Sequence, residues 1–329
     1  MDTGQDVVYT ADRWACGKHT RRGGQKMLTV TPTDKTLGAT IDGLDLSQPV
    51  SDADFRDLMI ALGQYGVLRF PGQALESQDL KAFSERFGDI QGSISKRKSP
   101  SECPGVGILS NVVENGAYIG APDAGQDWHT DMSYRDEMGF VNVLYGIQIP
   151  RRDGRVLGGT EFSNMHQAYD ELPTELKTRL QDATAVHDFE KFWEHMRQNH
   201  GSSRPALTDE QRRLRPPVNH PLFLTHPITG KKVLYANPGY VTRINGIPES
   251  ESDEILAFLF DYQLQDRFRY LYTWTEGDVL VWDLFGTLHR AIADYRPDEY
   301  RLMKRCQVMA TKIFDPSYRK SVALEPAFV

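Results

Sequence analysis

The chain of 329 residues lacks long apolar runs. Its most apolar stretches, "VLVW" at 279–282 and "ILAFLF" at 255–260, are far shorter than the about 20 residues that a membrane-spanning helix requires. The first 26 residues carry positive charge but no apolar segment of the kind that marks a secretory signal. These absences predict a protein with no membrane partner.

Cysteine and clustered positive charge are also scarce. Cys16, Cys103 and Cys306 are odd in number and far apart, so they match neither a disulfide framework nor the spacing of a zinc knuckle. A reducing compartment is the simplest interpretation, and we therefore expect a cytoplasmic protein. The net charge is −7 and the basic residues are dispersed, which argues against a nucleic-acid partner.

Internal repeats, low-complexity tracts and long Pro/Gly linkers are missing as well, which favours one domain over two. We expect residues 1–26 to be a disordered leader, or to precede the true start at Met27. Residues 27–329 then form a single domain. Within it, approximately 163–262 is expected to be a helical and irregular insertion between early and late core strands.

Local patterns predict the elements of this domain. Alternating apolar and polar residues after Met27 indicate short strands. A helix is expected over 51–66, with Ser51 as N-cap and Gly66 at its end, and another over 77–88. Further strands are expected at 67–70, 140–150, 277–283 and 305–313.

The stretch "DWHTDMSY" at 127–134 places His129 and Asp131 two residues apart. If this stretch is a strand, residues i and i+2 point to the same face, so an imidazole and a carboxylate share one volume. Two metal ligands are arranged in this way. An ordinary polar strand face has the same pattern, and this spacing alone leaves both interpretations open.

A third ligand has to come from the remaining histidines. His289 follows an apolar strand and begins another strand-like run, where an inward imidazole can close on the pair. Two His and one carboxylate leave three coordination positions open, as in the facial triad of non-haem Fe(II) oxygenases. The other candidates lie in charged or loop-like sequence and are expected to be solvated or core histidines: His166, His187, His195, His200, His220 and His226.

Four motifs in order give a specific resemblance. They are "WHTDMSY" at 128–134, "GGTEF" at 158–162, "LTHPITGKKVLYANPGY" at 224–240 and "WDLFGTLHRAIADYRPDEYRLMKR" at 282–305. Together they resemble the TauD/TfdA family of Fe(II)/2-oxoglutarate-dependent dioxygenases, over about residues 28–315.

The resemblance implies a mainly β fold with outer helices, the double-stranded β-helix or jelly roll. It implies that His129, Asp131 and His289 hold Fe(II), and that 2-oxoglutarate and O2 are co-substrates. Arg301, twelve residues after His289, matches the arginine that grips the distal carboxylate of 2-oxoglutarate. Thr160 matches a family threonine that adds a hydroxyl to the same carboxylate, although the stretch ending at this threonine is "GGT" here, one residue shorter than the common "GGDT".

For the substrate, Arg305 matches a family arginine that meets a substrate anion, the alternative being a surface cation. Trp128, Tyr134 and Phe285 flank the ligands and are expected to line the pocket, or else to be plain core. The stretch 87–102 lacks the histidines that taurine dioxygenases use for the sulfonate, which argues against taurine. It holds instead Lys96, Arg97 and Lys98.

The predicted function is therefore hydroxylation of a small anionic substrate, with release of succinate and CO2. A sulfonate, sulfate ester, aryloxyalkanoate or other carboxylate fits. Two alternatives stay open: a cupin-like metal hydrolase or lyase that does not use 2-oxoglutarate, and a non-catalytic jelly-roll binding protein. The resemblance also allows a homo-oligomer, a dimer or tetramer.

Overall fold

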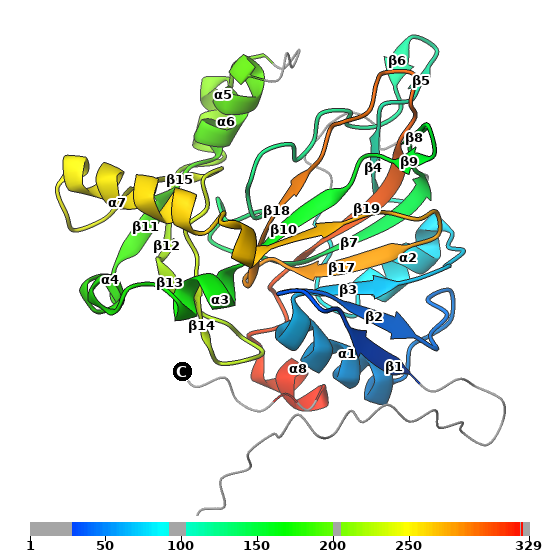
Figure 1. The fold of residues 1–329 in the computed structure, drawn as a ribbon, viewed down its shortest axis with the longest axis horizontal. Coiled ribbons are helices and arrows are strands. Elements are labelled where there is room, and N and C mark those ends of the chain that lie inside the picture. The colour runs from blue at the N-terminus through cyan, green and yellow to red at the C-terminus, as the bar shows by residue number, and fades with distance from the viewer. Residues whose placement is uncertain (1–27, 92–102, 200–204, 323, 325–329) are drawn as a thin grey trace, which may run out of the picture.

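The computed structural model describes residues 28–91, 103–199, 205–322 and 324, and its central feature is a seven-stranded sheet (Figure 1). The strand order is β1, β2, β3, β17, β7, β19, β4, and every pair except β2–β3 is antiparallel. The bounds are β1 Thr29–Pro32, β2 Ala39–Asp42, β3 Val67–Phe70, β4 Gly107–Ser110, β7 Gly139–Gln148, β17 Val279–Asp283 and β19 Leu302–Met309. Late strands therefore lie between early ones. All five residues of β17 are buried, as a strand covered on both faces requires.

A second, three-stranded sheet faces the first. It has the order β16, β10, β18, with bounds Arg269–Tyr272, Thr160–Asn164 and Thr287–Ala291. The ring centroids of Phe162 on β10 and Trp282 on β17 are 5.6 Å apart. Leu144, Leu280 and Met303 join them in one buried cluster. The inward faces of the two sheets thus enclose an apolar core.

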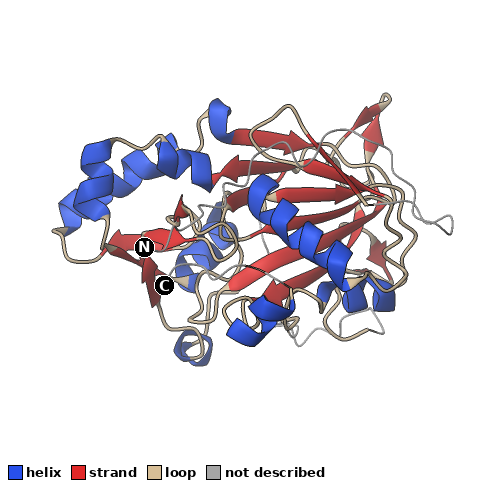
Figure 2. Ribbon diagram, turned by 90° about the horizontal axis from the view of Figure 1, so that it is seen from below, coloured by secondary structure: helices blue, strands red, loops and turns tan. Residues whose placement is uncertain are grey.

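The outer face of the large sheet is covered by helices (Figure 2). The helix α1 spans Asp52–Tyr65, α2 spans Ser77–Ser84 and α8 spans Pro316–Ser321. The predicted N-cap is confirmed, because Ser51 Oγ accepts from the Asp54 N–H at 3.1 Å. The predicted second helix ends earlier than expected: the amides of Arg86 and Phe87 bond to carbonyls three residues back, which tightens the chain after Ser84.

The insertion contains more strands than the sequence predicted. Its helices are α3 Met165–Asp170, α4 Thr174–Leu180, α5 Phe189–Asn199, α6 Asp209–Arg213 and α7 Glu249–Tyr262. Between them lie β11 Thr184–His187, β12 Val218–Pro221, β13 Phe223–Thr225, β14 Lys232–Leu234 and β15 Val241–Ile244. These form one sheet of order β12, β11, β15 and the hairpin β13–β14. Strands of three or four residues are too short to show a clear alternation, and the expectation of a helical and irregular segment missed them.

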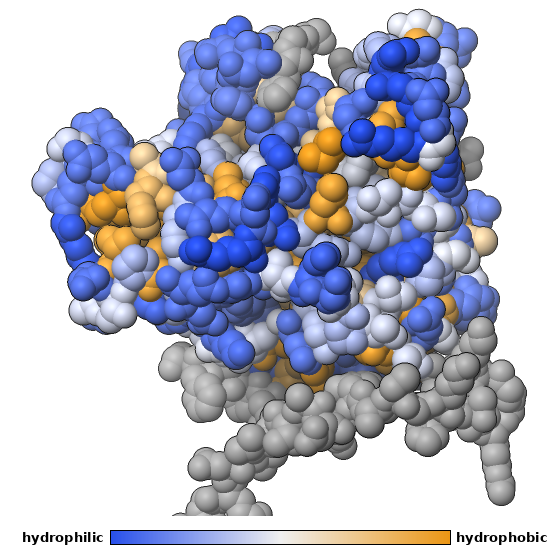
Figure 3. All heavy atoms as spheres, in the orientation of Figure 1, coloured by the Kyte–Doolittle hydropathy of each residue, from blue (hydrophilic) through white to orange (hydrophobic). Residues whose placement is uncertain are grey.

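Short ribbons and a 3-10 helix complete the described elements: β5 Val113–Glu114, β6 Ala117–Tyr118, β8 Arg151–Arg152, β9 Arg155–Val156 and η2 Asp266–Phe268. The face in Figure 3 is mostly hydrophilic, with apolar side chains gathered over α7, where Phe258 is exposed. Among the described residues, no helix combines the length and apolar character needed to cross a bilayer. Three predicted features lie outside the described residues: the leader 1–26, Lys96 to Lys98, and His200.

Candidate active site

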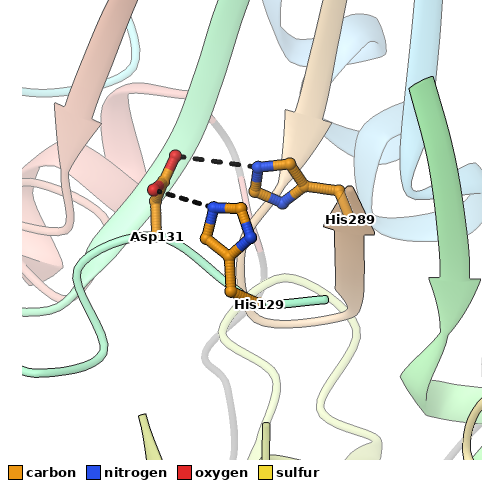
Figure 4. Close-up of side chains that lie close together, drawn as sticks. All are labelled: His129, Asp131 and His289. Atoms are coloured by element: carbon orange, nitrogen blue, oxygen red, sulfur yellow. Dashed lines mark ion pairs between the residues drawn. The ribbon is translucent and has the colours of Figure 1, made fainter. Parts of the chain in front are cut away.

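Three buried side chains predicted to be metal ligands meet at one point. His129, Asp131 and His289 each offer a ligand atom, and the three atoms lie within 4.8 Å of one another. Asp131 Oδ1 is 3.4 Å from His129 Nε2, and Asp131 Oδ2 is 3.7 Å from His289 Nε2 (Figure 4). Two imidazole nitrogens and a carboxylate oxygen converging in this way are the donor set of a non-haem Fe(II) centre.

The segment that carries His129 and Asp131 is not the regular strand that the spacing suggested. His129 exchanges two backbone hydrogen bonds with His289, at 3.1 and 2.8 Å, as an isolated bridge beside β18. A turn at 131–134 follows, in which Met132 has a φ of 61°. The condition of a regular strand is therefore not met here. The bridge and the turn, rather than strand alternation, bring the two side chains together.

Three adjacent strands of the large sheet each aim one side chain at this triad. From β7, Asn142 Nδ2 donates to Asp131 Oδ2 at 2.7 Å. From β17, the Trp282 ring packs against His289 with centroids 5.0 Å apart. From β19, Arg305 Nη1 lies 3.6 Å from Asp131 Oδ2. The triad is therefore held against the inner face of the sheet.

Backbone contacts also fix the His129 tautomer. His129 Nδ1 is 2.7 Å from the Asp127 carbonyl oxygen, which can only accept, so Nδ1 carries the proton. The Nε2 lone pair is then directed toward Asp131. Such a partner on the second ring nitrogen is the usual way in which proteins orient a metal-binding histidine.

The protonation states of Asp131 and His289 favour the binding of a cation by the triad. Burial opposes ionisation of the Asp131 carboxyl, but the contact with the His129 ring and the positive charge of Arg305 outweigh that effect. The pKa of the Asp131 carboxyl is therefore held well below its usual range. Burial lowers the pKa of His289 to about 3. An ionised carboxylate beside a neutral imidazole is the protonation state in which both bind metal.

The two residues predicted to hold the co-substrate are both buried near the small sheet. Arg301 precedes β19, and its side chain packs on Gly158, where an added Cβ would lie 3.0 Å from Arg301 Cδ. Thr160, two residues beyond Gly158, accepts a hydrogen bond from Trp274 Nε1 at 3.0 Å. The Arg301 Nε atom is buried and has no hydrogen-bond partner within the described residues. A buried guanidinium with an unused donor fits an anionic ligand.

The predicted aromatic residues occupy different surroundings. Tyr134 is buried in a cluster with Phe189 and Tyr240, and burial together with the Asp131 charge raises its pKa to about 12. The Trp128 ring lies 5.0 Å from the Arg290 guanidinium carbon. Phe285 packs in the large core against Phe140 and other rings. The structure therefore brings Tyr134 toward the triad and places Phe285 among the rings of the core.

Sequence reasoning missed the residues of the insertion that cover the triad. The Phe192 ring on α5 lies 5.4 Å from the His129 ring, and Tyr240 lies 6.3 Å from it. Gly239 permits this approach, because a Cβ there would be 2.9 Å from His129 Cβ. Tyr240 ends the "ANPGY" motif, which was a usable signal, whereas nothing in the charged sequence around Phe192 distinguished it. Asn142 was missed as well, because no sequence signal marks a single polar residue inside an apolar strand.

The predicted background histidines divide by burial. His187, His220 and His226 are buried, whereas His166 is half-buried and His195 is exposed and lies 3.2 Å from Asp127. In the described part of the chain, none of them joins a group of three metal-ligating side chains. The prediction that they are core or solvated histidines is consistent with these positions.

Comparison with known families decides the identity of the chain. Residues 29–307 match the profile of "Taurine catabolism dioxygenase TauD, TfdA family", and this range includes all three triad residues. The chain belongs to the TauD/TfdA family of dioxygenases. The resemblance predicted from four short motifs is thus confirmed over most of the sequence.

Relatives of known name cover most of the chain. It is 30% identical to pentalenolactone F synthase of Streptomyces avermitilis over 282 residues, 82% of this chain and 90% of the relative. It is 32% identical to alpha-ketoglutarate-dependent 2,4-dichlorophenoxyacetate dioxygenase of a Burkholderia species over 260 residues, 76% of this chain and 84% of the relative.

Among solved structures, a putative alpha-ketoglutarate-dependent 2,4-D dioxygenase from Burkholderia xenovorans is similar, with a TM-score of 0.70 and 28% identity. The match covers 87% of this chain and 98% of that one. AAD-2 in complex with Mn(II) and N-oxalylglycine has the same fold, with a TM-score of 0.71 and 24% identity, over 92% of this chain and 100% of that one.

The family and the triad together establish the reaction class. This TauD/TfdA enzyme is a dioxygenase that depends on Fe(II), 2-oxoglutarate and O2. The two alternatives that the residues alone left open, a hydrolase or lyase and a binding protein, lose their support. The donor set also fits the metal, because it pairs two imidazoles with one carboxylate and leaves positions open.

Proposed function

We propose that this dioxygenase holds Fe(II) with His129, Asp131 and His289 and hydroxylates a small anionic organic substrate. The observation that carries the proposal is the buried triad, in which an ionised carboxylate faces a neutral His289. With Fe(II), 2-oxoglutarate and O2 bound, such a centre supplies the oxidant that converts a substrate C–H bond to C–OH while 2-oxoglutarate becomes succinate and CO2. The chain's own residues bind and orient both organic molecules.

The fold proposed for this task is a double-stranded β-helix within one domain, residues 27–329. Two facing sheets with an apolar interior support it, and the triad lies where β18 and the His129 bridge close one end of that interior. The insertion, approximately 163–262, then forms a wall over the triad through Phe192 and Tyr240.

Arg301 and Thr160 are proposed to hold the distal carboxylate of 2-oxoglutarate. A guanidinium can donate two parallel hydrogen bonds to a carboxylate, and burial from water strengthens them. Support comes from the buried, unpartnered Nε of Arg301 and from Thr160, whose oxygen accepts from Trp274 and leaves its hydroxyl proton to be donated.

Arg305 is proposed to meet the anionic group of the substrate. It is a cation beside the triad, it lies on an inward position of β19, and about a quarter of its side chain stays exposed. Names of relatives give the range of anions in the family: 2,4-dichlorophenoxyacetate, phenoxypropionate and sulfonate dioxygenases, and an alkylsulfatase. A sulfonate, sulfate ester, aryloxyalkanoate or other carboxylate is the class proposed here. A cytoplasmic location and a homo-oligomer stay predictions.

The deciding experiment is anaerobic loading with Fe(II) and 2-oxoglutarate, followed by admission of O2 and measurement of succinate. A panel of small sulfonates, sulfate esters, aryloxyacids and other carboxylates supplies the substrates. We expect succinate that requires both Fe(II) and 2-oxoglutarate and that one class of compound stimulates, with an equal amount of hydroxylated product. Protein that binds Fe(II) but produces no succinate with any compound would contradict the proposal.

The role of Arg305 is tested by R305A. Loss of a charge-assisted hydrogen bond of about 1.5–3 kcal/mol should raise the KM for the stimulating substrate roughly 10- to 150-fold. The KM for the co-substrate, which Arg301 is proposed to hold, should change little. Lys304→Ala, a change at the adjacent cation on the other face of β19, is the matched control and should leave both values unaltered. An unchanged substrate KM in R305A would remove Arg305 from the binding site.

A further inference from the structure

The turn between β17 and β18 is organised around one buried carboxylate. Asp283 ends β17 with 1% of its surface exposed. Its Oδ1 accepts from the Phe285 N–H at 3.0 Å and its Oδ2 from the Gly286 N–H at 2.6 Å. The Thr287 hydroxyl donates to the Asp283 backbone carbonyl. One residue therefore accepts hydrogen bonds from two backbone amides and one hydroxyl of the turn that leads into β18.

The same carboxylate is also the acceptor for a histidine from the insertion. His226 lies in the β13–β14 hairpin and is fully buried, with Nε2 2.9 Å from Asp283 Oδ2. Its Nδ1 accepts from the backbone N–H groups of Ile228 and Thr229, each at 3.2 Å. Because Nδ1 is occupied as an acceptor, Nε2 has to carry the proton, and it donates to Asp283. The hairpin thus fixes the tautomer that the turn requires.

This turn touches both halves of the metal triad. The Leu284 carbonyl accepts from the Thr130 hydroxyl at 2.7 Å, and Thr130 stands between His129 and Asp131. On the other side, β18 begins at Thr287 and carries His289 two residues later. A displacement of the turn would therefore move His289 relative to Asp131.

The side chains of His226 and Asp283 are closely packed on several sides. A Cβ added at Gly286 would lie 2.5 Å from Asp283 Oδ2 and 3.2 Å from the His166 ring. The His166 and His226 rings are 4.9 Å apart, and Phe285 packs on His226 with centroids 6.1 Å apart. Residue 286 has to be glycine for the carboxylate to keep its position, so this geometry is tightly specified.

We propose that His226 and Asp283 are positioning residues of the metal centre: they hold the β17–β18 turn, and through it set the separation of His289 from the His129–Asp131 pair. Neither residue belongs to the group of three proposed metal ligands. This inference rests on the proposed metal role of the triad. It gives the insertion a second role besides covering the site, because the insertion supplies the histidine.

The test measures metal affinity in the full chain with Mn(II), which needs no turnover. His226→Phe keeps ring volume and removes the donor and the acceptor. We expect its Mn(II) dissociation constant to rise about tenfold. This is the lower end of the loss in metal affinity seen when residues that orient metal ligands are replaced. His226→Gln keeps an amide donor in reach of Asp283 and should recover most of the affinity, even if His226→Phe folds poorly.

The matched control is His187→Phe. His187 is equally buried in the insertion, and its ring nitrogens have no hydrogen-bond partner within the described residues. A fall in affinity in His226→Phe but not in His187→Phe, with recovery in His226→Gln, supports the proposal. Equal affinity in wild type, His226→Phe and His226→Gln overturns it. If wild type itself binds no Mn(II), the proposed metal site fails instead, so the two failures are distinct.

Discussion

Two histidine–aspartate arrangements lie on either side of the β17–β18 turn, and they differ in how fully their polar atoms are satisfied. At the His226–Asp283 pair, the carboxylate accepts three hydrogen bonds of 2.6 to 3.0 Å and the imidazole has partners on both nitrogens. At the triad, the nitrogen-to-oxygen distances are 3.4 and 3.7 Å, and His289 Nδ1 has no partner among the described residues.

The difference separates a structural pair from a metal site. Distances beyond about 3.2 Å are too long for good hydrogen bonds, so the triad's donors are held around a shared point rather than bonded to one another. Three hydrogen bonds leave Asp283 little acceptor capacity for a cation. Asp131 instead receives one short hydrogen bond, from the Asn142 amide to Oδ2, and its Oδ1 faces His129. The same residue types therefore form a proposed metal site in one place and support a turn in the other.

The largest expected effect comes from exchanging each aspartate for asparagine. Asp131→Asn removes the anionic ligand, so added Mn(II) should no longer raise the melting temperature. In wild type, metal at 100 times its dissociation constant adds about 2.7 kcal/mol. Asp283→Asn should instead lower the melting temperature in the absence of metal. Each buried donor left without an acceptor should reduce the free energy of unfolding by roughly 1–3 kcal/mol.

Differential scanning fluorimetry with and without Mn(II) measures both variants in one series. Asp283→Asn should keep a metal-dependent rise, smaller than that of wild type because its affinity is weaker. A rise of wild-type size in Asp131→Asn would show that the aspartate is not a ligand, and the contrast drawn between the two arrangements would collapse.

Much of the site was accessible from sequence because its signals are local. Ligand types, the two-residue spacing and the strand before His289 predicted the triad, although the assumed strand geometry at His129 was wrong. The prediction that the His129 and Asp131 side chains lie together still holds, because the bridge to His289 and the turn at Met132 bring them to the same point. Helix α1 was predictable for a similar reason, since its cap and apolar stripe lie within one short stretch.

The remaining features depend on contacts between distant segments. Asn142 is eleven residues from Asp131 and sits in an apolar strand, so no spacing marks it. His226 was assigned to the background because its partner is 57 residues away. The strands of the insertion were missed for a different reason: three or four residues are too few to show a clear alternation of apolar and polar side chains, even where two strands pair as a hairpin.

The smallest expected effect concerns a third kind of buried histidine. His187 has neither a metal nor a carboxylate partner within the described residues: burial, followed by the charges of His220 and Lys191, lowers its pKa to about 3. The value in the unfolded chain is about 6.5, so between these two pH values the unfolded state binds more protons. Stability should therefore fall as pH falls below about 6.5, with a slope of up to about 1.4 kcal/mol per pH unit from this residue.

His187→Phe removes this proton uptake, so comparison with wild type isolates the contribution of His187 to the pH dependence of stability. The melting temperature of the variant minus that of wild type should be constant above about pH 7.5 and should increase steadily from about pH 6.5 to pH 5, by an amount equivalent to about 1–2 kcal/mol. Thermal scans across this range provide the measurement. A difference that stays flat down to the lowest pH would mean that His187 binds its proton in the folded protein, and that a partner satisfies it as fully as Asp283 satisfies His226.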